Sequence, residues 1–169
     1  MTAIRLRAME PEDLDWLYRI ENDMEAWVHG VTNVPYSHYA LRDFIAHSTG
    51  DIYSDGQVRM IVETVDGEPV GVADVMSFDA KNNRAEVGII IERRHRGKGY
   101  GTQSLTLLAD YALRILHLHQ LHAIVALDNE ESLRVFEKAG FSKSAFLRDW
   151  LYDGERYYEA VLMQKMLSI

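Results

Sequence analysis

The segment from Ala85 to Leu116 constrains the fold of this chain more than any other. It begins with AEVGIIIE (85–92), whose β-branched run is interrupted only by Gly88 and is typical of a strand covered on both faces. It ends with apolar residues at helical spacing between 102 and 116, which predict an amphipathic helix. Between them lies RRHRGKGYG (93–101), where four basic residues and a histidine accompany three glycines.

A glycine-rich loop in this position favours the binding of an anion. The first amides of a helix have no partner within the helix, and the helix dipole favours negative charge there. A pyrophosphate would bond to the amides of about residues 97 to 102, with charge-assisted contacts from Arg96 and Lys98. The alternative is a tight glycine turn whose basic residues are solvated.

Known phosphate motifs narrow the choice. The chain contains no GxxxxGK[ST] string, and Thr102 stands where a GxGxxG fingerprint needs its last glycine. What remains is R-x-x-G-x-G, formed by Arg96, Gly99 and Gly101.

The remaining elements alternate between strands and helices. Sequence patterns predict strands at 4–9, 58–65, 70–78, 121–127, 144–152 and 156–167, the second and third joined by an Asp66-Gly67 turn. They predict helices from Pro11, from a Ser37 cap to His47, and from a capping box of Asp128 and Glu131 to Gly140. We therefore expect an α/β (α+β) fold in one domain over 1–169, with a mixed, mostly antiparallel sheet.

Composition limits the partners and the compartment. The net charge of −8 argues against general nucleic-acid binding and suits a cationic partner, although it also serves solubility. The chain has no cysteine, no secretory leader and no apolar stretch approaching the ~18 residues of a membrane helix, so we expect a cytoplasmic protein that does not bind membranes. The cluster of His117, His119 and His122 lacks nearby carboxylates except Asp128, so we expect no metal site.

Two motifs together resemble the GNAT family of N-acetyltransferases. One is EVGIIIERRHRGKGYG (86–101) followed by a helix, and the other is IVALDNEESLRVFEKAGF (124–141). The resemblance covers the whole chain and is strongest to the spermidine and ribosomal-protein N-acetyltransferase branch. It implies a sheet splayed at its centre, acetyl-CoA as cosubstrate, and direct attack by a primary amine through a tetrahedral intermediate.

The resemblance also assigns residues to the site. Backbone groups near Ile89, Ile90 and Ile91 would pair with pantetheine, and the Ile91 amide would polarise the thioester carbonyl. Asn129, Ser132 and Phe136 occupy positions that flank the pantetheine arm. The cofactor loop would contribute Arg96, Gly97, Lys98, Gly99, Tyr100, Gly101 and Thr102.

Glu86 is the expected catalytic base, because most amines are protonated at neutral pH and must lose a proton before attack. The alternative is an ordinary strand-end glutamate paired with Arg84, and Asp74 is a second candidate base. The family commonly has a tyrosine at the position of Phe136, which donates a proton to the leaving thiolate. Phenylalanine cannot do this, so the thiolate leaves unassisted or another tyrosine substitutes: Tyr100, Tyr111, Tyr152 or Tyr157.

The acceptor is the least constrained partner. We expect a small amine, a polyamine-like compound or a peptide N-terminus, and a homodimer is possible; the alternative function is a non-catalytic acetyl-CoA-binding module. Aromatic and acidic residues of the N-terminal helices are candidates for binding the amine by cation–π contacts, although packing in the core is the simpler expectation. These are Trp16, Trp27, Tyr36, Tyr39 and Asp43.

Overall fold

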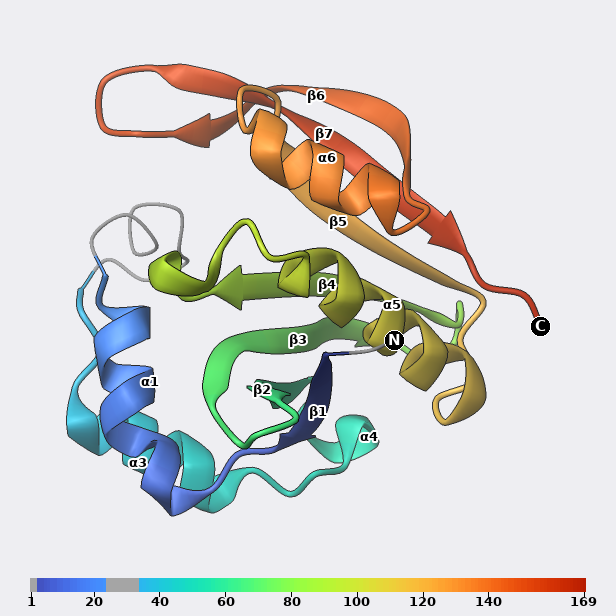
Figure 1. Ribbon diagram of the computed structural model, residues 1–169. Coiled ribbons are helices and arrows are strands. Elements are labelled where there is room, and N and C mark those ends of the chain that lie inside the picture. Colours follow the sequence, from blue (N-terminus) through green and yellow to red (C-terminus); the bar gives the residue numbers. More distant parts are fainter. Residues whose placement is uncertain (1–2, 24–33) are drawn as a thin grey trace.

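A seven-stranded sheet in the order β1-β2-β3-β4-β5-β7-β6 runs through the computed structural model, which describes residues 3–23 and 34–169 (Figure 1). Every neighbouring pair is antiparallel except β4 and β5, which are parallel. The strands are β1 Ile4–Ala8, β2 Val58–Thr64, β3 Pro69–Asp79, β4 Arg84–Ile91, β5 Gln120–Ala126, β6 Ser142–Tyr152 and β7 Tyr157–Met166. The predicted fold, a mostly antiparallel sheet flanked by helices, is confirmed.

Helices cover both faces of the sheet. The α-helices are α1 Leu14–Glu21, α3 His38–His47, α4 Ile52–Asp55, α5 Tyr100–Arg114 and α6 Glu130–Lys138, and short 3-10 helices span Pro11–Asp13 and Arg93–His95. Helix α5 packs on β1, β3, β4 and α6, where buried aliphatic residues form the larger core. Helices α1 and α3 pack together on the opposite face around Trp16, Leu17 and Leu41.

Most helix ends lie where the sequence predicts them. Ser37 caps α3 by accepting a hydrogen bond from the Ala40 amide, and Gly140 ends α6 with a φ of +91°. The capping box predicted for α6 is wrong in register: the cap is Asn129, whose side chain accepts from the Ser132 amide at 3.1 Å. Helix α4 is too short to show a helical period and was not predicted.

Candidate active site

The sheet opens between β4 and β5. Only three residue pairs join these strands, from Arg84 opposite Gln120 to Glu86 opposite His122. Beyond Glu86, β4 remains paired with β3, and beyond His122, β5 remains paired with β7. The two halves of the sheet therefore separate toward the carboxyl ends of β4 and β5, as the predicted splay requires.

Backbone groups of alternate residues face this gap. In an antiparallel ladder, successive residues direct their amide and carbonyl to opposite sides. The Glu92 amide donates to the Val70 carbonyl at 2.8 Å, so the backbone groups of Glu92, and of Ile90 two residues before it, point toward β3. The backbone groups of Ile89 and Ile91 therefore point the other way, toward β5. Of the three predicted isoleucines, Ile89 and Ile91 thus present backbone groups to the gap, while the Ile90 side chain packs against the Trp16 cluster.

The loop after β4 leads directly into the start of α5. Gly97 and Gly99 have φ values of +77° and +82°, in the left-handed region that favours glycine. Gly99 is the N-cap residue of α5, and it has no side chain that could accept a hydrogen bond from the first turn. The amides of Tyr100, Gly101 and Thr102 are therefore not capped by a side chain. This is the arrangement that an incoming phosphate uses.

Gly101 brings α5 close to the gap. A Cβ at this position would lie 3.2 Å from Val135 Cγ1 and 3.3 Å from Ile89 Cδ1. The glycine therefore lets the start of α5 approach β4 and α6 together. Its role in the structure is close packing, which also places the amides beside the predicted pantetheine path.

The basic residues of the loop are engaged with neighbouring groups. Arg93 pairs with Asp23 at 3.0 Å, and Arg94 lies within 3.4 Å of both Glu68 and Glu92. Arg96 donates from Nε to the Ile91 carbonyl at 3.1 Å. Much of the apparent basic patch is therefore neutralised locally.

The residues predicted on α6 separate into two environments. Asn129 and the half-buried Ser132 lie at the start of the helix, next to the end of β5. Phe136 is only 4% exposed, and its ring meets that of Phe141 edge to face at a centroid distance of 5.1 Å. Phe136 is therefore part of the core, and its side chain brings no hydroxyl to this position.

Glu86 lies at the closed end of the gap. Its partner Ser77 occupies a bulge in β3, with a φ of +49°, and donates from Oγ to Glu86 Oε2 at 3.3 Å. His122 stands opposite; burial lowers the pKa of this histidine, while the negative charge of Glu86 opposes that shift. Sequence reasoning missed Ser77, because a bulge leaves no signal in a β-branched run.

Asp74, the second candidate base, is held by an arginine. Arg59 donates to both carboxylate oxygens of Asp74, at 2.7 and 2.9 Å, and also pairs with Glu21. All three side chains are largely buried. Asp74 therefore serves a buried ion-pair network, which favours Glu86 as the base.

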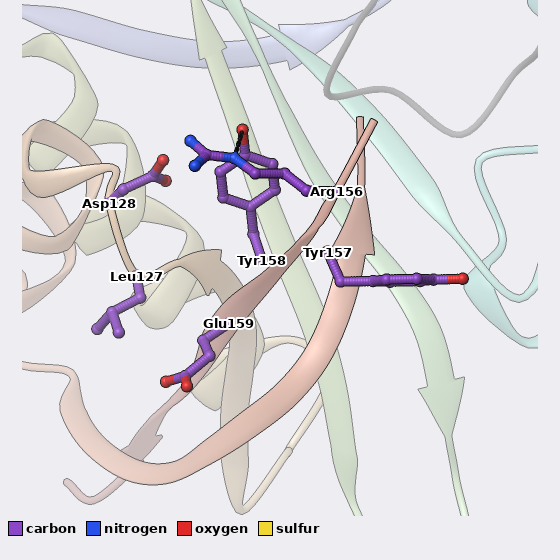
Figure 2. A pocket seen from close by; sticks show the side chains of 6 residues that line it. All are labelled: Leu127, Asp128, Arg156, Tyr157, Tyr158 and Glu159. Carbon is purple, nitrogen blue, oxygen red and sulfur yellow. Dashed lines mark hydrogen bonds between the residues drawn. The ribbon is translucent and has the colours of Figure 1, made fainter. Parts of the chain in front are cut away.

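A cavity of about 370 Å³ lies at the open end of the gap, where β5 ends and β7 begins (Figure 2). Arg156 donates from Nε to the Tyr158 hydroxyl at 2.8 Å, and its guanidinium carbon lies 4.7 Å from the centre of that ring. Figure 2 shows Asp128 and Arg156 pointing toward each other. Leu127, Tyr157 and Glu159 complete the lining.

The tyrosines considered as proton donors fall in two places. Tyr100 and Tyr111 pack against the larger core, where burial raises the pKa of Tyr111. Tyr152 and Tyr157 lie in the β6–β7 hairpin with ring centroids 4.8 Å apart, and of the four candidates Tyr157 lines the cavity.

The aromatic candidates for amine binding also divide. Trp16 is buried and donates to Glu92, and Tyr36 packs beside it, whereas Tyr39 is 75% exposed. Asp43 pairs with His47 at 3.1 Å. Trp27 lies outside the described residues.

Among residues 3–23 and 34–169, no cluster of three or more potential ligands is able to hold a metal, and no helix is long and apolar enough to cross a membrane.

Comparison with known proteins identifies the family of this chain. The family model described as the Acetyltransferase (GNAT) domain matches residues 3–142, and the chain belongs to this family. It is 30% identical over 165 residues to the spermidine N(1)-acetyltransferase of Escherichia coli K12, covering 95% of this chain and 84% of the relative. A putative ribosomal N-acetyltransferase of Bacillus subtilis is 27% identical, with 94% of this chain and 88% of the relative covered.

Solved structures show the same fold. The crystal structure of spermidine N-acetyltransferase from Vibrio cholerae in complex with CoA and spermine superposes with a TM-score of 0.83 at 26% identity, covering 97% of this chain and 95% of that one. The predicted enzyme class is confirmed: the chain is an acetyl-CoA-dependent N-acetyltransferase acting on an amine.

Proposed function

We propose that the gap between β4 and β5 binds acetyl-CoA, with the pyrophosphate on residues 96–102 and the thioester near Ile91. The observation that carries this proposal is that three residue pairs alone join the two strands, which leaves the backbones of Ile89 and Ile91 directed into the opening. Asn129 and Ser132, at the start of α6, form the opposite wall. We further propose that residues 1–169 form one domain, because a single sheet extends from Ile4 to Met166.

The chemistry follows from the groups on each side of this gap. The Ile91 amide donates a hydrogen bond to the carbonyl oxygen of the thioester and stabilises the charge that develops there when an amine attacks. Glu86 accepts the proton of the attacking amine through a chain of ordered waters, because it lies five residues before Ile91, about 16 Å along the extended strand, on the face of the sheet opposite α5. Ser77 orients this carboxylate.

The acceptor we propose is a small polyamine-like molecule. The Escherichia coli relative is named a spermidine N(1)-acetyltransferase, and the structure of the Vibrio cholerae spermidine N-acetyltransferase contains CoA and spermine. In this chain, Asp128, Glu159 and two tyrosine rings line the cavity at the open end together with Arg156, whose guanidinium lies over the Tyr158 ring as a second ammonium group of the acceptor would. The net charge of −8 favours the approach of a cation.

An acceptor screen tests this function. The purified chain is incubated with acetyl-CoA and a panel of polyamines, monoamines, amino acids and peptides with free N-termini, and release of the CoA thiol is followed. We expect the highest kcat/KM with a polyamine. A preference for peptide N-termini would overturn the acceptor class while leaving the cofactor site intact.

A further inference from the structure

Glu92 is the first residue after β4, and its side chain is only 13% exposed. Several hydrogen-bond donors surround its carboxylate. Trp16 Nε1 donates to Oε2 at 3.2 Å, and Arg19 Nη2 donates to Oε1 at 3.1 Å, so both contacts come from α1. Arg94 Nε lies 3.3 Å from Oε1. Burial alone would raise the pKa of Glu92, but these donors together hold it below its usual value, so the side chain is ionised at neutral pH.

The backbone of Glu92 is also bound on both sides. Its amide donates to the Val70 carbonyl at 2.8 Å, and its carbonyl accepts from the His95 amide at 2.8 Å. One residue therefore touches β3, α1 and the beginning of the cofactor loop. Ile91, whose amide faces the gap, is its immediate neighbour in the chain.

His95 gives a second, independent sign that this carboxylate matters. Within the described part of the chain, its Nε2 is the buried side-chain atom that finds no hydrogen-bond partner. That atom lies 3.3 Å from Glu68 Oε1 and 3.8 Å from Glu92 Oε2, without an aligned hydrogen bond to either. A buried polar atom of this kind costs free energy unless nearby charge offsets the cost. Glu68 and Glu92 are thus the carboxylates nearest to a buried, unpartnered atom of this loop.

We propose that Glu92 is a positioning residue for acetyl transfer: held by Trp16 and Arg19, its carboxylate fixes the end of β4 and the start of the cofactor loop in one arrangement. This inference rests on the proposed cofactor site. Glu92 acts through two neighbours, the Ile91 amide that faces the thioester and the loop amides that face the pyrophosphate. Any shift at Glu92 reaches both.

The test compares Glu92→Gln with wild type in steady-state kinetics, varying acetyl-CoA and acceptor separately. The amide retains the size of the side chain and removes its charge. We expect KM for acetyl-CoA to rise roughly tenfold, more than KM for the acceptor and with a smaller fall in kcat, because the loss of a charge-assisted contact loosens the loop proposed to bind the pyrophosphate. The matched control is Asp110→Asn, which removes the charge of an exposed carboxylate paired with Arg114 on α5.

A second variant keeps the test decisive if Glu92→Gln folds poorly. Arg19 is 62% exposed, so Arg19→Gln leaves the core unchanged and removes one donor to Glu92. We expect a smaller rise in KM for acetyl-CoA in Arg19→Gln. In the double variant of Arg19→Gln and Glu92→Gln we expect a KM no higher than that of Glu92→Gln alone, because the effects of substituting two residues of one network are not additive. An unchanged KM in Arg19→Gln, additive effects, or wild-type kinetics with only a lowered melting temperature in Glu92→Gln would each overturn the proposal. Failure of the proposed function would show instead as wild-type protein that does not bind CoA.

Discussion

Arg96 donates a hydrogen bond from Nε to the backbone carbonyl of Ile91, over 3.1 Å. The proposed phosphate-binding arginine therefore holds the residue whose amide is proposed to polarise the thioester. Because the Ile91 carbonyl is held by Arg96 and the following amide by Val70, the peptide between Ile91 and Glu92 has little freedom to rotate. The two ends of the proposed cofactor site are thus joined through one hydrogen-bonded turn.

Gly99→Asp should abolish CoA binding. The new carboxylate would stand where the pyrophosphate approaches the start of α5, and it would repel that anion. The left-handed φ of +82° adds backbone strain of roughly 1 kcal/mol. Isothermal titration with CoA measures the loss. Gly56→Asp is the matched control, because Gly56 has a φ of +71° with nothing within 4 Å and lies outside the site. CoA affinity equal to that of wild type in Gly99→Asp would contradict the placement of the pyrophosphate.

Glu86→Gln should lower kcat by roughly 100-fold or more, because a positioned base commonly contributes that much. CoA affinity should remain unchanged, since Glu86 lies at the closed end of the gap, away from the loop. Rates measured from pH 6 to 9 with saturating acetyl-CoA test this, because a lost base alters the pH profile as well as the maximum. Ser77→Ala should show a milder loss of the same kind. If the variant follows the wild-type profile at every pH, Glu86 is an ordinary strand-end carboxylate.

Phe136→Tyr should raise kcat. The substitution restores the hydroxyl that the family commonly has at this position, which would protonate the leaving thiolate. The ring is packed edge to face on Phe141, so its orientation should be retained. Stopped-flow and steady-state rates with saturating substrates measure the gain. A lower melting temperature without any gain would mean that the hydroxyl points into the core, where an unpaired polar group costs about 1 to 3 kcal/mol.

Regular periodicity made the fold predictable from sequence. The alternation in β2 and β3, the apolar stripe of α5 and the glycine that ends α6 all reflect contacts local in the chain, and the structure places these elements within one or two residues of prediction. The turn before α5 was also predictable, because Gly97 and Gly99 occupy left-handed φ angles that other residues rarely adopt.

The features that sequence could not reveal depend on distant partners. Glu92 gains its role from Trp16 and Arg19, more than seventy positions away, and Asp74 is tied to Arg59 across a strand pair. Ser77 reaches Glu86 only because β3 bulges there. The spacing of charged and polar residues in the sequence does not predict which distant side chain each one contacts. These contacts could therefore be identified only in the three-dimensional structure.

Arg156→Gln should improve the use of acceptors that carry more than one ammonium group. The guanidinium lies over the Tyr158 ring and beside Asp128, which is the position that a second ammonium of the acceptor would take. Removing this cation should lower KM for a triamine by roughly three- to tenfold while leaving a monoamine unaffected, since only the triamine reaches the cavity. The ratio of kcat/KM for spermidine and a monoamine measures the change. Arg134→Gln, an exposed arginine on α6 paired with Glu130, is the control. Equal changes for both acceptors would exclude the cavity as part of the acceptor site.

Asp13→Asn should make the chain less stable at neutral pH, and the difference should shrink in acid. Burial alone would raise the pKa of Asp13, but hydrogen bonds from Arg7, at 2.8 and 2.9 Å, and from the Glu10 amide, at 2.8 Å, bring it below its ordinary value of 3.8. The unfolded chain therefore binds more protons than the folded one between these two pKa values.

It follows that the contribution of Asp13 is complete above about pH 4 to 5 and is lost as the pH falls through its lowered pKa. Urea unfolding at pH 7, 5, 4 and 3 measures this: we expect the variant to be about 1 to 3 kcal/mol less stable than wild type at pH 7, and closer to it at pH 3. Asp110→Asn, whose carboxylate is exposed, should show little difference from wild type at any pH. A deficit in Asp13→Asn that stays constant from pH 7 to 3 would mean that the ion pair with Arg7 contributes nothing, and that the loss comes from packing of the N-terminal turn alone.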